Sequence, residues 1–146
     1  MPSINKSALL AHPRELMFEL VARVEDYPRF LPWCGGTSVS HRDDGAILAT
    51  VTIAFKGIRQ SFTTVNQQVA FESIAMDLVE GPFTALHGRW RFVEIREDAC
   101  RVDFSLEYQF GPGILGRALS PVFDHIASTM VDAFVRRADQ IGASRG

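Results

Sequence analysis

The sequence lacks the residue patterns that mark disulfide-rich, metal-binding and membrane-spanning proteins. Its 146 residues include only two cysteines, Cys34 and Cys100, which form no CxxC pair and no series with metal-ligand spacing. Its four histidines are scattered, without an HxH or HExxH motif. No apolar run approaches the roughly 20 residues that span a bilayer, and no signal-peptide pattern opens the chain. We therefore expect a reduced, cytoplasmic protein without a metal site and with at most peripheral membrane contact.

Charge excess and catalytic motifs are equally scarce. The net charge of −2 argues against a general positive coat for nucleic acid, and we expect no DNA partner. There is no GxSxG motif, no glycine-rich phosphate loop and no carboxylate pair at recognisable spacing, so no catalytic residue is assigned. Phenylalanine, by contrast, occurs eleven times against two tyrosines. Because phenylalanine fills volume without requiring a hydrogen bond, this bias favours a large core or an apolar cavity.

The order of the predicted elements is strand, helix, short turn, hairpin strands and long helix. No linker or internal repeat divides the chain, so we expect a single domain over residues 1–146. Residues 2–10 predict a strand, and Pro13 is expected at the first position of the helix that follows. Residues 27–34 contain two prolines, which exclude a regular helix and favour a short turn or lid. About six hairpin-connected strands follow, from residue 35 to residue 110.

The longest predicted element is a C-terminal helix within residues 113–141, where apolar residues recur at three- and four-residue steps. Ser120 and Pro121 leave two interpretations open: the main helix begins at this pair, or a shorter turn from Ile114 is kinked into it. The residues expected on the apolar face are Leu115, Leu119, Val122, Ile126, Met130, Phe134, Ala138 and Ile141, widened by Ile114, Ala118, Phe123, Ala127, Val131 and Val135.

Together these elements predict an α+β protein in which a curved antiparallel sheet wraps around the C-terminal helix. Such a sheet has more concave apolar surface than one helix can fill, which favours a cavity between them. Ligand pockets in proteins usually hold roughly 300–1,000 Å³, and we expect that range here. In the last hairpin, a symmetric turn at residues 96–99 would place Arg89 opposite Glu107.

Five segments of the chain carry a resemblance to a known family. They are residues 27–34 (YPRFLPWC), 55–58 with 62–64, 78–83 with 86–92, 102–108, and 130–138. In this order, and over nearly the whole chain, they resemble the START-like (helix-grip) proteins of the coenzyme Q-binding family. That family was once grouped with polyketide cyclases and lipid-transport proteins. Its bacterial members include the RatA-type ribosome-association toxins.

The resemblance implies a helix-grip fold and a non-enzymatic protein that supports respiratory quinone function. Its partner would be a hydrophobic small molecule, ubiquinone or a similar polyprenyl quinone, held between helix and sheet with no required cofactor. The RatA-type members imply an alternative, in which the protein binds the large ribosomal subunit and blocks subunit association. A polyketide cyclase or dehydrase is a third reading, but it needs placed acid–base groups and the predicted inward faces are almost wholly apolar.

The candidate ligand-binding residues are apolar and come from the 27–34 turn, the inward strand faces and the long helix. They are Tyr27, Phe30, Leu31, Pro32, Trp33, Val51, Ile53, Phe55, Phe83, Trp90, Phe92, Phe104, Leu106, Phe123, Ile126, Met130 and Phe134. For the turn, core packing is the competing interpretation.

Three further features have a functional and a plain interpretation, and we favour the plain one for each. Cys34 is a small buried hydrophobe rather than a nucleophile. Glu80 is the exposed end of a strand rather than a carboxylate in the cavity. The arginines at positions 89, 91, 101, 136 and 137 belong to a solvated face of mixed charge rather than to one basic patch for ribosomal RNA.

Overall fold

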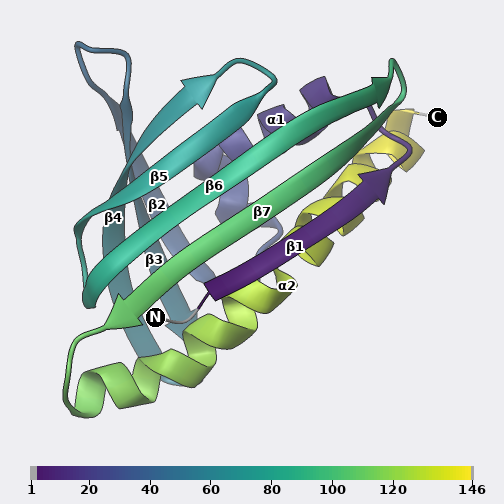
Figure 1. Ribbon diagram of the computed structural model, residues 1–146. Helices are drawn as coiled ribbons and strands as arrows, with labels where there is room; N and C mark the ends of the chain where they lie inside the picture. The colour runs from purple at the N-terminus through teal and green to yellow at the C-terminus, as the bar shows by residue number, and fades with distance from the viewer. Residues whose placement is uncertain (1–2, 146) are drawn as a thin grey trace.

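The computed structural model describes residues 3–145 and places them in a seven-stranded antiparallel sheet, two α-helices and one 3-10 helix (Figure 1). In chain order the elements are β1 (Ser3–Leu10), α1 (Arg14–Ala22), the 3-10 helix η1 (Val24–Arg29), β2 (Cys34–His41), β3 (Ile47–Phe55), β4 (Ile58–Val69), β5 (Ser73–Glu80), β6 (Phe83–Arg96), β7 (Ala99–Phe110) and α2 (Ile114–Arg145). The predicted first strand is confirmed over residues 3–10, and residue 2 lies outside the described residues.

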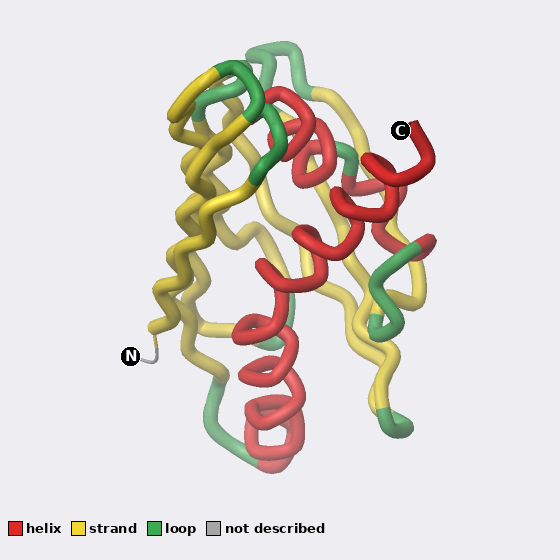
Figure 2. Tube along the Cα trace, turned by 90° about the vertical axis from the view of Figure 1, so that its right-hand side faces the viewer, coloured by secondary structure: helices red, strands yellow, loops and turns green. Residues whose placement is uncertain are grey.

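The sheet has the strand order β1-β7-β6-β5-β4-β3-β2. Strands β2 to β7 follow one another as hairpins, whereas β1 pairs with β7 at the edge opposite β2. The segment of α1 and η1 therefore carries the chain from one edge of the sheet to the other. The long helix α2 lies on the concave side, between the two limbs of the curved sheet (Figure 2). This arrangement confirms the predicted α+β helix-grip fold.

The two turns that connect β2, β3 and β4 contain residues with positive φ angles. Between β3 and β4, Lys56 and Gly57 have φ angles of 51° and 81°, the positive pair that a two-residue hairpin turn demands. Between β2 and β3, Gly45 has a φ of 89°, and the Ala46 backbone N–H donates to Asp44 Oδ1 at 3.0 Å. The two-proline segment forms no regular α-helix, as predicted. Its first proline, Pro28, lies within the 3-10 helix η1.

Aromatic side chains fix α2 against the β6–β7 hairpin. Trp90 of β6 lies opposite Phe104 of β7, and their ring centroids are 4.3 Å apart. Phe134 of α2 packs edge-on against Trp90, with centroids 5.4 Å apart. Such pairs each contribute about 0.5–1.5 kcal/mol beyond the area that they bury. The centre of the core is therefore a stack of rings shared by sheet and helix.

The register of this hairpin differs from the predicted one. Arg89 lies opposite Ser105, and Glu107 lies opposite His87. The predicted pair of Arg89 and Glu107 is wrong because the chain turns at residues 97–98 and β6 carries a β-bulge near Glu94, both of which shift the register.

The helix α2 runs without interruption past Pro121, which decides between the two interpretations of its start in favour of Ile114. Its buried positions confirm most of the predicted apolar face: Leu119, Val122, Phe123, Ile126, Ala127, Val131, Phe134 and Ala138. The prediction is wrong in the first turns, where Ile114 is 84% exposed, Leu115 is 50% exposed and Ala118 is exposed. This end of the helix projects beyond the ends of the strands (Figure 2).

The first helix begins one residue later than predicted. Pro13 is the N-cap of α1 rather than its first helical residue, and its carbonyl accepts the Leu16 N–H at 3.1 Å. Met17, Phe18 and Val21 are the residues that α1 buries.

Gly116, near the start of α2, lies against the loop that leaves β7. A Cβ atom there would be 2.4 Å from the carbonyl oxygen of Gly111, which is closer than any real contact. Gly116→Ala should therefore destabilise the protein by about 1–3 kcal/mol, although Gly→Ala within a helix ordinarily stabilises it by about 1 kcal/mol. Urea unfolding at pH 7 measures the change. Gly142→Ala is the matched control in α2, because its Cβ meets only the movable His12 ring, at 3.1 Å. Equal effects of the two substitutions would contradict the steric argument.

A polar cluster joins β1 to β7. Ser7 Oγ donates to Asp103 Oδ1 at 2.7 Å, and Arg101 Nε donates to the same oxygen at 3.1 Å. Partial burial opposes ionisation of Asp103, but these two hydrogen bonds and the charge of Arg91 outweigh it and hold the pKa below its ordinary value of 3.8. The ionised carboxylate thus stabilises the fold above that pH, and the contribution is lost as the pH falls through the lower pKa of the folded state.

Asp103→Asn should lower the free energy of unfolding by about 1 kcal/mol at pH 7, because it removes a charge-assisted acceptor. The difference from the unsubstituted protein should shrink as the pH falls below about 4, where the unfolded carboxyl becomes protonated. Urea unfolding between pH 7 and pH 2 measures it. Asp98→Asn, at an exposed position, is the control. A difference that stays constant with pH would refute the assignment.

Candidate functional site

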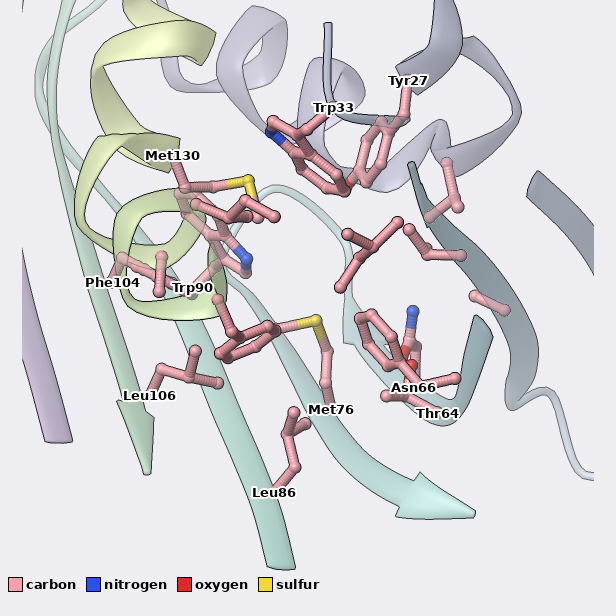
Figure 3. Close-up of a pocket in the computed structure, with 18 residues that line it drawn as sticks. Tyr27, Trp33, Thr64, Asn66, Met76, Leu86, Trp90, Phe104, Leu106 and Met130 are labelled. Atoms are coloured by element: carbon pink, nitrogen blue, oxygen red, sulfur yellow. The ribbon is translucent and has the colours of Figure 1, made fainter. Parts of the chain in front are cut away.

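A small cavity lies between the concave face of the sheet and α2 (Figure 3). Its volume is about 70 Å³. Strands β3 to β7 supply one wall, α2 supplies the opposite wall, and η1 with the following turn closes one side. The lining residues are Val24, Tyr27, Trp33, Ala49, Val51, Ile53, Phe62, Thr64, Asn66, Met76, Leu86, Trp90, Phe104, Leu106, Phe123, Ile126, Ala127 and Met130.

Ten of the seventeen predicted ligand-binding residues line this cavity. They are Tyr27, Trp33, Val51, Ile53, Trp90, Phe104, Leu106, Phe123, Ile126 and Met130. The structure places the other seven elsewhere: Phe30, Leu31, Pro32, Phe55, Phe83, Phe92 and Phe134. That any of these residues binds a ligand stays a prediction.

Several aromatic residues that were predicted to line the cavity pack behind its lining residues instead. Phe134 packs edge-on against both Tyr27 and Trp90, with centroid distances of 5.4 Å to each. Phe83 packs edge-on against Phe123 at 4.9 Å. These rings point inward, as the sequence pattern predicts, but they stand behind the residues that face the empty space.

The 27–34 turn both lines the cavity and packs into the core. Tyr27 and Trp33 line the cavity, whereas Leu31 is buried in the core. Phe30 lies on the outer side, between the Phe134 ring and the Arg137 guanidinium. The turn is thus a wall of the cavity and a packing element at once.

The cavity is smaller than the expected range, and its volume suits a few water molecules. Two methionines limit its size. The Cε atom of Met76 sits where Gly88 has no side chain, 2.6 Å from the position that a Cβ would take. Met130 extends from α2 into the same space (Figure 3). Because methionine is unbranched and flexible, these two side chains are the easiest parts of the wall to displace.

Two polar residues, Thr64 and Asn66, line the cavity and were absent from the predicted site. They lie on the inward face of β4 and are 5% and 4% exposed. The Thr64 hydroxyl donates to Asn66 Oδ1 at 2.7 Å. The signal that could have found them was the weak alternation of residues 60–69, where polar residues occupy inward positions that carry apolar residues in the neighbouring strands.

The described residues that line the cavity include no carboxylate, imidazole or amine. The lining does include one ionisable side chain, the phenol of Tyr27, whose hydroxyl donates to the Val21 carbonyl at 2.6 Å. Burial raises the pKa of Tyr27, so its hydroxyl stays protonated at neutral pH. The lining can therefore hold an apolar molecule by burial and hydrogen bonding, and it offers no group that titrates near pH 7.

Residues 10–135 match the family model for polyketide cyclase / dehydrase and lipid transport proteins. The chain belongs to this family. It is 39% identical over 145 residues to the ribosome association toxin RatA of Escherichia coli K12, covering 99% of this chain and 92% of that protein. It is 26% identical over 141 residues to the mitochondrial coenzyme Q-binding protein COQ10 homolog B of Xenopus laevis, covering 94% of this chain and 58% of that protein.

The fold is also that of the Zhui aromatase/cyclase from Streptomyces sp. R1128. The TM-score is 0.82 at 14% sequence identity, over 95% of this chain and 94% of that one. At this identity the likeness concerns the fold alone. Together these relationships confirm a START-like protein of a family that binds hydrophobic ligands.

Outside the cavity of this START-like protein, the plain interpretations of two residues agree with their surroundings. Glu80 is exposed at the end of β5. Cys34 is buried, and burial raises the pKa of its thiol, which disfavours the reactive thiolate. Residues 3–145 contain no cluster of three potential metal ligands. None of the described helices is long and apolar enough to cross a bilayer.

Four of the five arginines considered for a single patch lie on two separate surfaces. Arg89 and Arg91 lie on the outer face of the sheet and, with Lys6 of β1, border a shallow groove. Arg136 and Arg137 lie on α2, on the opposite side of the sheet, beside the 27–34 turn. These four arginines therefore do not form one continuous basic patch.

Proposed function

We propose that this protein binds a polyprenyl quinone, or a similar hydrophobic carbonyl compound, in the cavity beneath α2 without transforming it. The observation that carries the proposal is the lining, which is almost wholly apolar and holds no group that titrates near neutral pH. The coenzyme Q-binding relative supports a quinone as the ligand class. Acting in the cytoplasm with at most peripheral membrane contact, such a binder would support respiratory quinone function.

Binding requires the cavity to open, because its 70 Å³ is well below the volume of ligand pockets, roughly 300 Å³ or more. Displacement of the Met76 and Met130 side chains is the easiest route. Each methylene of the ligand that becomes buried contributes about 0.8 kcal/mol, from which the cost of opening is subtracted. A long isoprenoid tail must leave the cavity, and its natural exit is beside the 27–34 turn, where a groove of about 220 Å³ separates the turn from α2. Affinity should then level off after a few isoprene units.

Met130→Lys should abolish binding of a short-tail ubiquinone, because an unpaired ammonium in the apolar cavity is very costly. Met130→Leu, which keeps volume and polarity, should bind nearly as the unsubstituted protein does.

Met76→Ala should bind more tightly, because it enlarges the cavity, while it lowers stability by about 1–3 kcal/mol. Quenching of Trp33 and Trp90 fluorescence during titration measures affinity. Binding that ignores both methionines would place the ligand elsewhere, and absence of quenching would remove quinones from the candidates.

A second candidate function is that of a RatA-type protein that binds the large ribosomal subunit. The higher identity to RatA, 39% over 99% of this chain against 26% over 94% for the coenzyme Q-binding relative, favours it. The two arginine-bearing surfaces are the places where such contact with RNA phosphates would be made.

Addition of the protein to separated ribosomal subunits should then lower the monosome peak in a sucrose gradient, and the effect should weaken steeply as salt rises. Arg136→Glu with Arg137→Glu should abolish it. Arg89→Glu with Arg91→Glu, on the opposite surface, is the matched comparison. Met130→Lys should keep full activity in this assay, which separates the two functions. An unchanged gradient at micromolar protein would retire the ribosomal candidate.

A further inference from the structure

The inward face of β4 places one unpartnered polar group at the wall of the cavity. Asn66 is 4% exposed, and its Oδ1 atom accepts the hydrogen bond from the Thr64 hydroxyl. Its amide nitrogen has no hydrogen-bond acceptor among residues 3–145. Figure 3 shows this nitrogen directed away from Thr64 and into the cavity. A buried amide donor that faces empty space is thus built into an otherwise apolar wall.

An unpaired buried donor is costly, by about 1–3 kcal/mol in proteins. In the described part of the chain, the only side-chain polar atom that protein atoms fully enclose without a partner is Arg14 Nε. The Asn66 nitrogen is therefore open to the cavity rather than sealed against the core. An apolar residue at this position would avoid the cost, which indicates that the donor serves something that enters the cavity.

The other polar groups of the lining share this character. The indole N–H groups of Trp33 and Trp90 also lack an acceptor within residues 3–145. The hydroxyls of Tyr27 and Thr64 are already committed, to the Val21 carbonyl and to Asn66 Oδ1. The N–H donors that remain without an acceptor at the cavity are therefore the Asn66 amide and the two indoles, although the two hydroxyl oxygens can still accept. A ligand that satisfies donors in an apolar pocket must bring an acceptor that carries no charge, such as a carbonyl oxygen.

We propose that the Asn66 side-chain amide donates a hydrogen bond to a carbonyl oxygen of the bound ligand, and that Thr64 is a positioning residue that fixes the orientation of this amide. This inference rests on the proposed function and sharpens it. The ligand class becomes hydrophobic molecules with a carbonyl at their buried end, quinones and apolar ketones, rather than hydrocarbons or fatty acids. The charged carboxylate of a fatty acid would find no cation in the lining.

The test compares two probes that differ only in their carbonyls. One is a benzoquinone with dimethoxy, methyl and decyl substituents, and the other is a benzene ring with the same substituents. Isothermal titration calorimetry should show that the unsubstituted protein binds the quinone about tenfold more tightly, the ratio expected for one hydrogen bond. Asn66→Leu should weaken quinone binding about tenfold and leave the benzene analogue unchanged or tighter. Thr64→Val should cause a smaller loss, because the amide remains but is free to turn.

Two further readouts separate hydrogen bonding from structure. The infrared carbonyl stretch of the quinone should shift to lower frequency on binding and lose that shift in Asn66→Leu. The melting temperature of the double variant Thr64→Val with Asn66→Leu should equal or exceed that of the unsubstituted protein, since it removes both partners of a buried hydrogen bond together with the unpaired amide donor. Thr50→Val is the control: its hydroxyl is hydrogen-bonded to Thr63 at 2.7 Å, away from the cavity, so neither probe should change affinity.

The outcomes are distinct. Equal affinity of the unsubstituted protein for both probes would overturn the role of Asn66 and leave the proposed function standing. Loss of both probes in Asn66→Leu would also overturn it, because Asn66 would then maintain the shape of the cavity. If neither probe binds the unsubstituted protein, the proposed function fails and the inference fails with it.

Discussion

A seven-stranded sheet that curves around α2 has more concave surface than one helix can cover, and the rest of the structure follows from how that surface is filled. Rings supplied by both layers do most of it. Trp90 and Phe104 stack on the sheet side, and Phe134 meets them edge-on from the helix. Because rigid rings cannot follow a curved surface everywhere, a space remains beside them. Flexible side chains, Met76 and Met130, then take up part of it.

The polar pair on β4, Thr64 and Asn66, adds a directional hydrogen-bonding group to the wall of this cavity. A wall of Val, Ile and Phe would bind any hydrocarbon of suitable shape, since apolar burial is not directional. Thr64 and Asn66 add one oriented donor, at the stability cost that an unpaired buried amide carries. The core is thus held largely by apolar residues that need no hydrogen-bond partner, and the buried polar pair of Thr64 and Asn66 lies at the wall of the cavity.

The sequence predicts the fold well because periodicity reports which side of an element is buried. Alternation along β3, β6 and β7 and the helical period of α2 suffice for the helix-grip arrangement. Periodicity does not report where the covering layer ends, which is why the exposed Ile114 was expected to be buried. It does not foresee the bulge that moves Arg89 opposite Ser105.

The candidate site is predicted less completely, for a related physical reason. An inward-facing ring can either line empty space or stand behind another ring, and only packing in three dimensions decides which. Phe104 lines the cavity, whereas Phe134, equally inward and aromatic, closes it. Polar residues on an inward face fail the apolar pattern altogether, so Asn66 lowers the strand signal at the very position where it carries chemical information.

The same packing decides which surface residue is the cleaner probe of a charge-dependent function. Arg137 lies over the Phe30 ring, with its guanidinium carbon 5.3 Å from the ring centroid, and Phe30 packs against Phe134 at 5.4 Å. Phe134 in turn contacts Trp90 in the wall of the cavity. Substitution of Arg137 therefore removes a cation–π contact along with a charge and disturbs a chain of rings that reaches the wall of the cavity. Arg136 is exposed one residue earlier and makes no such ring contact among the described residues. A loss of ribosome binding in Arg136→Glu alone would report electrostatics, whereas a loss in Arg137→Glu alone would also follow from a shifted turn.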